Sequence, residues 1–544
     1  MDLKHQESDI PLRGVFTCAA PALLIALLCL APYWNKAFTI DDTVFMKMAQ
    51  QALHHPLRPY GFHTCWFGRG GAQALTVAPP VYPVIAYLLI PAVWLGSAEW
   101  AVHLIQFAIL AMGLLATVRL ALRLGLDRSE AMLASILVVV TPVALVLAST
   151  AMPDVPAMAI GALAIERFLA WTKEGKPSQG VAAAMLLALG PLTRPHLLLL
   201  LGVAALCVRD DVRVWDLRGW FRIPRRWAPI LAGALLYCGG VWLTREPSTG
   251  GVGATGLAFR TSFDWREFYL KALSMGVQWT LVTPLVAGWI WFHGRETRRW
   301  LLRAPLAIAL MPVGYAVHGR RGAAYSVLLA LTLCTLAEML ADSFQRRDHR
   351  QLMLSAWALL PVPILLYSQF AGKYLVAIAP AIAILLVARL GTGWKARWPV
   401  WGLAAVLLVE GVTMLNADAR FAEMGRTAAV RFIAPLVSRG EHVWVASQWG
   451  FLWYGERAGA QCLDVDLPAR PKPGDYVALG HLEWGFDFLQ DYRAQLLDKI
   501  TYREPGIRLM NANDDAGFYL HHWGALPWAW GSGELNRYEL WRME

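Results

Sequence analysis

The chain has 544 residues, of which 57% are hydrophobic and only 16% are charged, and its formal net charge is +10. An average soluble domain has roughly 25% charged residues, so this composition excludes an ordinary soluble protein and indicates one that crosses a membrane many times. The positive charge does not indicate a nucleic-acid partner, because the arginines gather in short loops between apolar stretches, as they do on the cytoplasmic side of membrane proteins.

Apolar stretches of sufficient length to cross roughly 30 Å of hydrocarbon recur along the chain. They are Gly14–Tyr33, Ala98–Leu124, Met132–Ala148, Val155–Trp171, Trp227–Leu243, Lys271–Phe292, Leu302–His318, Gly322–Ala341, Leu352–Phe370, Tyr374–Leu390 and Pro399–Leu415. The pattern predicts a polytopic α-helical membrane protein.

One further stretch, Val181–Val208, is interrupted by Gly190-Pro-Leu-Thr-Arg-Pro-His196. Both of its flanks are basic, which predicts two half-length helices that meet near Arg194 and brings the count to about thirteen segments. Non-helical backbone at membrane depth lines a cavity or is buried in protein, so this apex is a candidate site. The alternative is a proline kink in one long helix.

The basic loops fix an orientation. Clusters of arginine around Arg123, Arg218, Arg298 and Arg347 fall in alternate loops. This alternation predicts that the N-terminus lies on the cytoplasmic side of the plasma (inner) membrane. No cleavable signal is evident in the first apolar segment. Arg320 and Arg321 break the alternation: either that hairpin is misplaced or these side chains meet an anionic ligand.

The composition changes after Leu415, and residues 1–415 and 416–544 are predicted to be separate domains. Strand-like runs at 442–446, 475–479, 517–521 and 537–541 alternate with helical stretches at 427–437 and 486–497. With an odd number of spans before it, this small C-terminal α/β domain is expected to be extracytoplasmic or periplasmic. Residues 34–97 form the first outer loop, in which 77–95 is expected to lie along the membrane surface.

The seven cysteines show no metal-ligand spacing. Those in or beside the membrane segments are expected to act as small hydrophobic residues. Cys65 and Cys462 would both lie outside, and whether they pair is left open by the sequence.

Two acidic sites lie at outer ends of helices. Asp41 and Asp42 follow the first span, and Asp154 opens the fourth apolar stretch. Each could be no more than a helix cap, since carboxylates accept the unpaired backbone N–H groups there. Capping alone does not explain two acidic sites on the same face as an interrupted helix that carries Arg194.

Five short motifs, in order along about 350 residues, resemble the GT-C glycosyltransferases, in the branch of protein O-mannosyltransferases and lipid A aminoarabinose transferases. They are Asp41-Asp42, Pro79-Pro80-Val-Tyr82, Asp154-Val-Pro156, Thr193-Arg194-Pro195 and Lys373-Tyr374 followed by Pro380. The resemblance implies a GT-C-like membrane domain and a polyprenyl-phosphate sugar as donor substrate. In this family the first Asp, here Asp41, is the catalytic base, and Asp154 assists at the donor or acceptor pocket. Asp42, less directly placed than Asp41, is the third catalytic candidate.

This sequence departs from the family directly before the Pro-Pro pair. Family members often carry Glu-Lys or His there, whereas this chain has Val77 and Ala78. The substrate is therefore not fixed by the resemblance. The transfer could be of a hexose or a pentose, and the acceptor could be a glycan, a lipid or a protein.

The expected chemistry is a single inverting attack in which a carboxylate accepts the proton of the acceptor hydroxyl. The lipid-phosphate leaving group needs cations, which act strongly in a low-dielectric site. Arg194 and Lys373, with Tyr374 beside the latter, are the first candidates for binding it, and snorkelling to the interface is the alternative for each cation. Reserve candidates in the outer loops are Arg58, Arg69, Arg260 and Arg266. No resident cofactor is implied, although a divalent cation could assist.

Two other classes compete. A secondary transporter, or a protein that translocates lipid-linked sugars, would have internal repeats and ionisable residues near the midplane, and neither is found. A sensor or scaffold with a mere membrane anchor would not need about thirteen spans.

Overall fold

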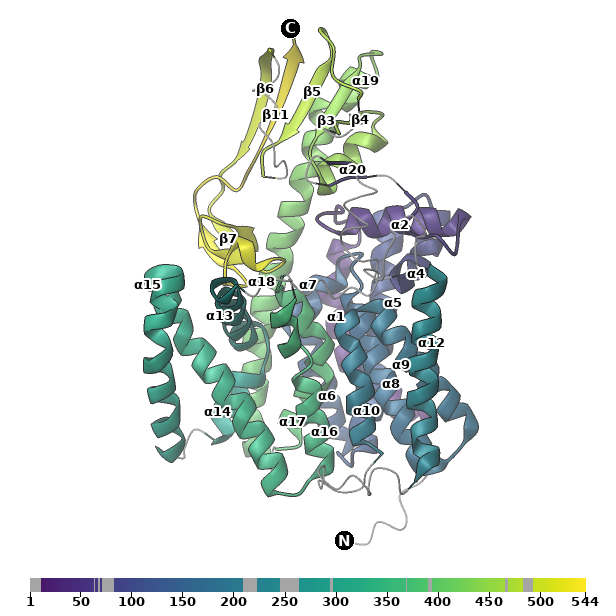
Figure 1. The fold of residues 1–544 in the computed structure, drawn as a ribbon, viewed down its shortest axis with the longest axis vertical. Coiled ribbons are helices and arrows are strands. Elements are labelled where there is room, and N and C mark those ends of the chain that lie inside the picture. Colours follow the sequence, from purple (N-terminus) through teal and green to yellow (C-terminus); the bar gives the residue numbers. More distant parts are fainter. Residues whose placement is uncertain are drawn as a thin grey trace.

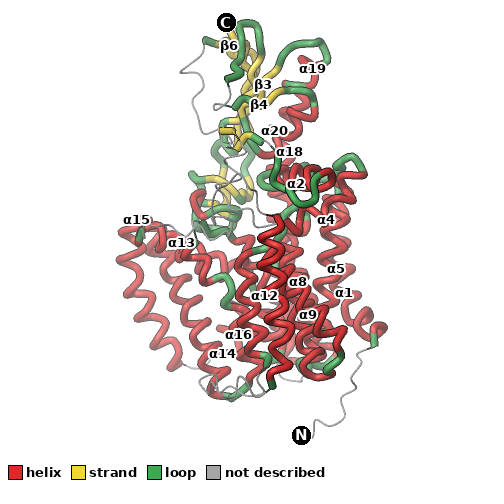
Figure 2. Tube along the Cα trace, turned by 45° about the vertical axis from the view of Figure 1, so that its right-hand side comes forward, coloured by secondary structure: helices red, strands yellow, loops and turns green. Residues whose placement is uncertain are grey.

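A computed structural model describes residues 11–62, 64–66, 69–70, 83–208, 223–244, 264–293, 297–367, 369–389, 394–464, 468–482 and 493–544. A bundle of long helices makes up most of the molecule, and a region rich in strands stands on one end of it (Figure 1). Figure 2 shows the same division from a second direction, with the strands gathered beyond the helices. We call the end of the bundle that carries this region the upper end.

The helices of the bundle follow the apolar stretches. Their bounds are α1 (Leu12–Leu30), α2 (Asp42–His54), α4 (Pro83–Trp94), α5 (Glu99–Arg123), α6 (Arg128–Val140), α7 (Pro142–Ala148), α8 (Asp154–Glu174), α9 (Pro177–Thr193), α10 (Leu200–Leu206), α12 (Ala228–Thr244), α13 (Trp265–Val282), α14 (Leu285–His293), α15 (Thr297–Gln345), α16 (His349–Ala358), α17 (Ala379–Val387) and α18 (Trp394–Phe432).

Among the described residues, six helices are long and apolar enough to cross a membrane, or up to eight if each of two bent pairs counts as one span. The chain is therefore a membrane protein with several spans, while the predicted count of about thirteen is not confirmed. The bent pairs are α6 with α7 and α13 with α14, with bends of 64° and 65°. Pro142 and Pro284 stand at the two bends, where the missing N–H of proline interrupts the helix.

The interruption near Arg194 is a true break in the helix. α9 returns antiparallel to α8 and ends at Thr193; Arg194 is extended, with φ −146° and ψ 125°, and a 3-10 helix, η2 (Pro195–Leu199), leads into α10. A proline kink within one continuous helix would have kept Arg194 helical. The break places Arg194 at the same end of the bundle as Asp154, the first residue of α8.

The long element α15 is a helical hairpin. His318 and Gly319 have non-helical backbone angles, which separates the two predicted apolar stretches, and the tip lies at the upper end (Figure 1). The Arg321 Nη1 atom lies 3.9 Å from Asp515 Oδ2 in the C-terminal region. The hairpin tip therefore lies at the same end of the bundle as the C-terminal region, and an anionic group that Arg321 meets is a carboxylate of the chain itself.

Two of the predicted basic loops lie together at the lower end; the loop that contains Arg218 lies outside the described residues. Arg350, at the start of α16, donates a hydrogen bond of 2.9 Å to the carbonyl of Leu124, which follows α5. The loops that contain Arg123 and Arg347 therefore share one side of the bundle, opposite α2 and the C-terminal region, as the alternation requires.

The upper region contains a mixed five-stranded sheet in the order β4-β3-β5-β11-β6. The strands are β3 (Val443–Ala446), β4 (Gln461–Cys462), β5 (Tyr476–Gly480), β6 (Ala494–Tyr502) and β11 (Asn536–Met543). β3 is parallel to β4 and β5, with α20 (Trp449–Arg457) in the β3–β4 connection, whereas β11 is antiparallel to both of its neighbours.

Two local predictions for this region are wrong. The stretch 486–497 was expected to be helical, but its described end belongs to strand β6, where pairing with β11 outweighs helix propensity. The run 517–521 was expected to be a strand; only Gly517 is one, in the two-residue strand β9 (Ala516–Gly517), and η9 (His521–Trp523) begins four residues later.

The expected domain boundary at residue 415 falls inside α18. This helix has 39 residues and continues without interruption from the bundle to Phe432, beneath the sheet (Figure 1). The division of the chain at this residue stays a prediction.

Cys462 forms a disulfide. The side chain of Cys65, the partner that the sequence suggested, lies outside the described residues.

Candidate active site

Asp41 forms an ion pair with a lysine from a distant part of the chain. Its Oδ2 atom lies 2.6 Å from Lys373 Nζ, in η7 (Gly372–Ile378), and the side chains of Asp41 and Lys373 are 26% and 5% exposed. Asp41 is the N-cap residue of α2, yet its side chain makes no capping hydrogen bond. The capping explanation therefore fails for this carboxylate, which is accessible and faces a cation.

Asp42 has a different environment. It is fully buried, and its two oxygens accept the backbone N–H groups of Thr39, at 3.2 Å, and Ala151, at 2.7 Å. Burial raises the pKa of the Asp42 carboxyl to about 7, although the positive charge of Lys36 and the two backbone N–H groups act against the increase. Asp42 thus joins the loop before α2 to the loop before α8, and it has no exposed surface.

The turn that presents Asp41 is strained. Ile40 has a φ of 48°, in the left-handed region that β-branched residues rarely adopt. Such strain persists only where the surrounding structure enforces it, and it is concentrated at functional sites.

Asp154 and Arg194 form a second, buried ion pair. Arg194 Nη2 lies 2.5 Å from Asp154 Oδ2, and the two side chains are 3% and 1% exposed. Asp154 Oδ1 has no hydrogen-bond partner among the described residues. Both cations, Arg194 and Lys373, are buried against carboxylates, so neither extends to the interface by snorkelling.

Tyr374 connects the two ion pairs. It follows Lys373 in the chain, and its buried ring lies 5.3 Å from Arg194 Cζ and 5.7 Å from the ring of His196. Four of the predicted site residues, Asp41, Asp154, Arg194 and Lys373, are therefore brought together with Tyr374 at the upper end.

The other candidates fare differently. Arg58 is exposed after the end of α2, and Arg266 is exposed in the first turn of α13. The side chain of Arg69, the whole of Arg260 and the Pro79–Tyr82 motif lie outside the described residues.

A third buried charge cluster was not predicted from the sequence. Lys36 forms an ion pair with Asp418 of α18 and donates to the carbonyl of Ser149 at 2.8 Å, while the Tyr519 hydroxyl donates to Asp418 Oδ1 at 2.9 Å. The only signals were a lysine beside the Asp pair and a carboxylate at the end of an apolar run. This cluster joins the loop before α2, the bundle and the C-terminal region.

The C-terminal region also contacts the segment that carries Lys373. The Gly372 N–H donates to the Phe518 carbonyl at 2.9 Å, and the His521 N–H donates to the Phe370 carbonyl at 3.0 Å. A Cβ added at Gly372 would lie 2.0 Å from Gln278 Oε1, so the close approach requires glycine here.

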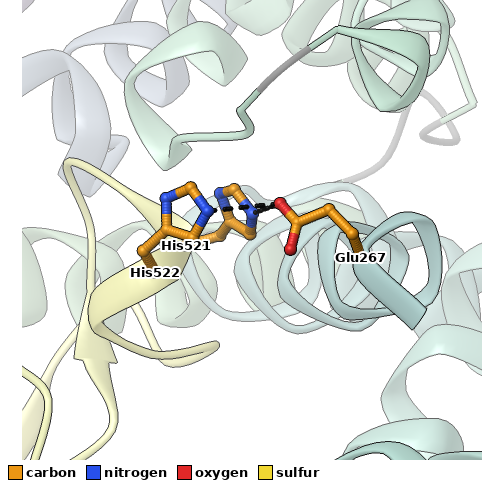
Figure 3. A group of neighbouring side chains, drawn as sticks. All are labelled: Glu267, His521 and His522. Atoms are coloured by element: carbon orange, nitrogen blue, oxygen red, sulfur yellow. Dashed lines mark hydrogen bonds and ion pairs between the residues drawn. The ribbon is translucent and has the colours of Figure 1, made fainter. Parts of the chain in front are cut away.

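One group among the described residues has the residue types of a metal site: Glu267, His521 and His522, whose ligand atoms lie within 4.8 Å of one another (Figure 3). The group joins α13 to η9. His521 also contacts Phe370, which lies two residues before η7, the element that contains Lys373.

One family model matches a part of the chain. Residues 77–243 match the model of the family described as dolichyl-phosphate-mannose-protein mannosyltransferase. The resemblance to the GT-C glycosyltransferases is confirmed. The matched stretch contains Asp154 and Arg194, whereas Asp41 precedes it and Lys373 follows it. A search of curated protein sequences found no match.

Solved GT-C structures are similar to the chain at low identity. ArnT from Cupriavidus metallidurans bound to undecaprenyl phosphate is 13% identical, over 89% of this chain and 96% of that one, with a TM-score of 0.45. The apo form of the Archaeoglobus fulgidus oligosaccharyltransferase is 12% identical, over 83% of this chain and 64% of that one, with a TM-score of 0.43. Scores of this size support no inference on their own, and none is drawn from them.

Proposed function

We propose that the chain is an integral-membrane glycosyltransferase that moves a hexose or pentose from a polyprenyl-phosphate carrier to an acceptor hydroxyl or phosphate at the outer face of the membrane. The observation that carries the proposal is the pairing of an accessible, uncapped Asp41 with the buried Lys373, beside the Asp154–Arg194 pair. The family match over residues 77–243 supports the reaction class.

In the proposed reaction the acceptor oxygen attacks the anomeric carbon from the side opposite the phosphate. The acceptor proton passes to the Asp41 carboxylate, the bond from the anomeric carbon to the phosphate oxygen breaks, and its electron pair leaves with the polyprenyl phosphate. One displacement inverts the anomeric configuration.

The two cations have a role in both the resting and the reacting states. With no donor bound, Lys373 neutralises Asp41 and Arg194 neutralises Asp154. A donor phosphate entering between them would accept hydrogen bonds from Lys373 and Arg194 and would compete with the carboxylates for them. As charge develops on the leaving phosphate, these positioned donors stabilise it. Tyr374 holds the guanidinium of Arg194 in place through its ring.

Asp42 has no place in this reaction, because both of its oxygens serve backbone groups and it is fully buried. We also propose that a divalent cation at the outer loops would share the charge of the donor phosphate with Lys373 and Arg194.

The test is incubation of purified protein with a panel of polyprenyl-phosphate sugars and membrane extract, with consumption of one donor as the readout. Undecaprenyl phosphate without a sugar serves as the lipid in the binding assays. We expect Asp41→Asn to abolish transfer, because an amide cannot accept the proton, and to leave the protein folded. Glu441→Gln, an exposed carboxylate in the C-terminal region, is the matched control and should retain full activity.

Undiminished turnover by folded Asp41→Asn would remove this residue as the base. Movement of an intact lipid-linked sugar across reconstituted vesicles, with no sugar transferred, would instead assign the chain to the translocating class.

A further inference from the structure

The group of Glu267, His521 and His522 makes an ordered set of contacts. His521 Nε2 lies 2.7 Å and His522 Nε2 lies 3.2 Å from Glu267 Oε1, and the two imidazole rings are 4.0 Å apart (Figure 3). The side chain of His521 is 1% exposed, whereas that of His522 is 50% exposed. The two adjacent histidines therefore touch the same carboxylate from very different surroundings.

The hydrogen bonds of His521 fix its tautomer. Its Nδ1 atom lies 3.2 Å from the backbone nitrogen of Phe370, and a backbone N–H can only donate, so Nδ1 must accept. An imidazole that accepts at Nδ1 carries no hydrogen there and is therefore neutral, and burial and the neighbouring His522 act in the same direction by lowering the pKa of His521. A neutral ring that accepts at Nδ1 carries its hydrogen on Nε2 and donates it to Glu267.

This tautomer is the wrong one for a metal at Nε2. A metal would need the lone pair of Nε2, and the hydrogen would then sit on Nδ1, against the N–H of Phe370. Histidines that bind metals through Nε2 have an acceptor opposite Nδ1, and here there is a donor. The geometry points to a structural clamp that holds Phe370.

The clamp continues along the chain toward Lys373. His521 holds Phe370 through both its ring and its backbone N–H, and three residues earlier the Phe518 carbonyl accepts the N–H of Gly372. Residues 517–521, which we call the strap, thus run beside residues 370–372. On its other side the strap is fixed to α13, where Gln278 Nε2 donates to the Gly517 carbonyl at 3.2 Å. Lys373 is the next residue after this paired segment.

We propose that His521 is a positioning residue for the donor-phosphate site: by fixing Phe370–Gly372 it sets the position of the Lys373 ammonium opposite Asp41. The proposal rests on the proposed function, since it takes Lys373 to bind phosphate. It also gives the C-terminal region a part in the reaction without direct contact with the substrate.

Three single variants test the clamp. His521→Ala removes the ring, His521→Asn retains a side-chain oxygen that can accept the N–H of Phe370, and His522→Ala is the matched control because His522 touches Glu267 but not Phe370. We expect His521→Ala to speed hydrogen exchange at the Phe370 and Gly372 amides and to weaken the binding of undecaprenyl phosphate, each by about tenfold, the effect typical of one lost hydrogen bond. His521→Asn should recover most of both, and His522→Ala should change neither.

Four results would overturn the proposal. Unchanged amide exchange in His521→Ala would show that the clamp does not hold the segment. Faster exchange with unchanged lipid affinity would show that the strap does not act on Lys373. Equal loss of both properties in His521→Asn and His521→Ala would show that acceptance from Phe370 is not what matters. Stoichiometric Zn²⁺ binding that both His521→Ala and His522→Ala abolish would assign the group to a metal.

Failure of the proposed function gives a different result. If the wild-type protein does not bind undecaprenyl phosphate at all, Lys373 has lost its proposed ligand. The amide-exchange comparison does not depend on that outcome, so the two failures are distinguishable.

Discussion

The buried pair of Arg194 and Asp154 allows stability to be separated from donor binding. Removal of one member of a buried ion pair leaves an uncompensated charge and costs about 3–5 kcal/mol. Side-chain exposures of 3% and 1% and a separation of 2.5 Å place this pair in that class. We therefore expect Arg194→Gln and Asp154→Asn each to reduce the folded-to-unfolded ratio by at least two orders of magnitude, since about 1.4 kcal/mol corresponds to tenfold.

The double variant Arg194→Gln/Asp154→Asn should recover most of that stability, because no buried charge is left without a partner and two amides of similar shape can hydrogen-bond to each other. Donor binding should stay weak, because the cation that meets the phosphate is gone. The assay is thermal stability in detergent together with affinity for undecaprenyl phosphate, measured on the same preparation. Arg431→Gln, which breaks the exposed pair with Asp498, is the control and should cost less than about 1 kcal/mol.

Two results would refute this reasoning. If the double variant is as unstable as either single variant, the two side chains do not stabilise each other as a pair. If the double variant is stable and binds the lipid normally, Arg194 has no role at the phosphate.

Further predictions follow from single contacts. Burial raises the pKa of Asp42 to about 7 from an ordinary value of 3.8, so the folded state binds this proton more tightly than the unfolded state does. The free energy of unfolding therefore falls as the pH rises through that range. Melting temperatures at about pH 5 and pH 8 should differ more in the wild type than in Asp42→Asn. Gly372→Ala places a Cβ 2.0 Å from Gln278 Oε1, so it should reduce transfer by displacing the next residue, whereas Gly402→Ala in α18, where an added Cβ meets nothing within 4 Å, should leave transfer unchanged in the same donor-consumption assay. A cysteine at Ser438, exposed beside the sheet, should react with a membrane-impermeant thiol reagent in intact cells. A cysteine at Ser178, in the first turn of α9 at the lower end, should react only after lysis. The opposite labelling pattern would show that the predicted orientation in the membrane is inverted.

The sequence predicted a membrane protein with several apolar helices, because apolar length determines where a chain can cross a membrane, but the predicted count of about thirteen spans is not confirmed. It also predicted the break at Arg194, since Gly190, Pro191 and Pro195 interrupt an otherwise continuous helix. It did less well in the C-terminal region, where short strands such as β9 owe their conformation to partners far along the chain, and local propensity carries little information about them.

At the site, the sequence identified the charged residues but could not pair them. Asp41 and Asp42 are adjacent and chemically identical, and only their contacts distinguish them: one meets Lys373 and the other accepts two backbone N–H groups. Asp418 was missed because its partner Lys36 lies 382 residues away. A single sequence contains no record of such a distance.

The continuity of α18 has a consequence for engineering. A helix of 39 residues is about 58 Å long at 1.5 Å per residue and has no hinge at residue 415. A truncation at that point would divide the continuous helix and would also remove Asp418. Exchange of the C-terminal region between homologues would change the residues that contact Lys36 and the segment before Lys373. The bundle and the C-terminal region are therefore not interchangeable modules, and a chimaera joined at any point of α18 should take the strap from the same parent as residues 370–372 and Gln278.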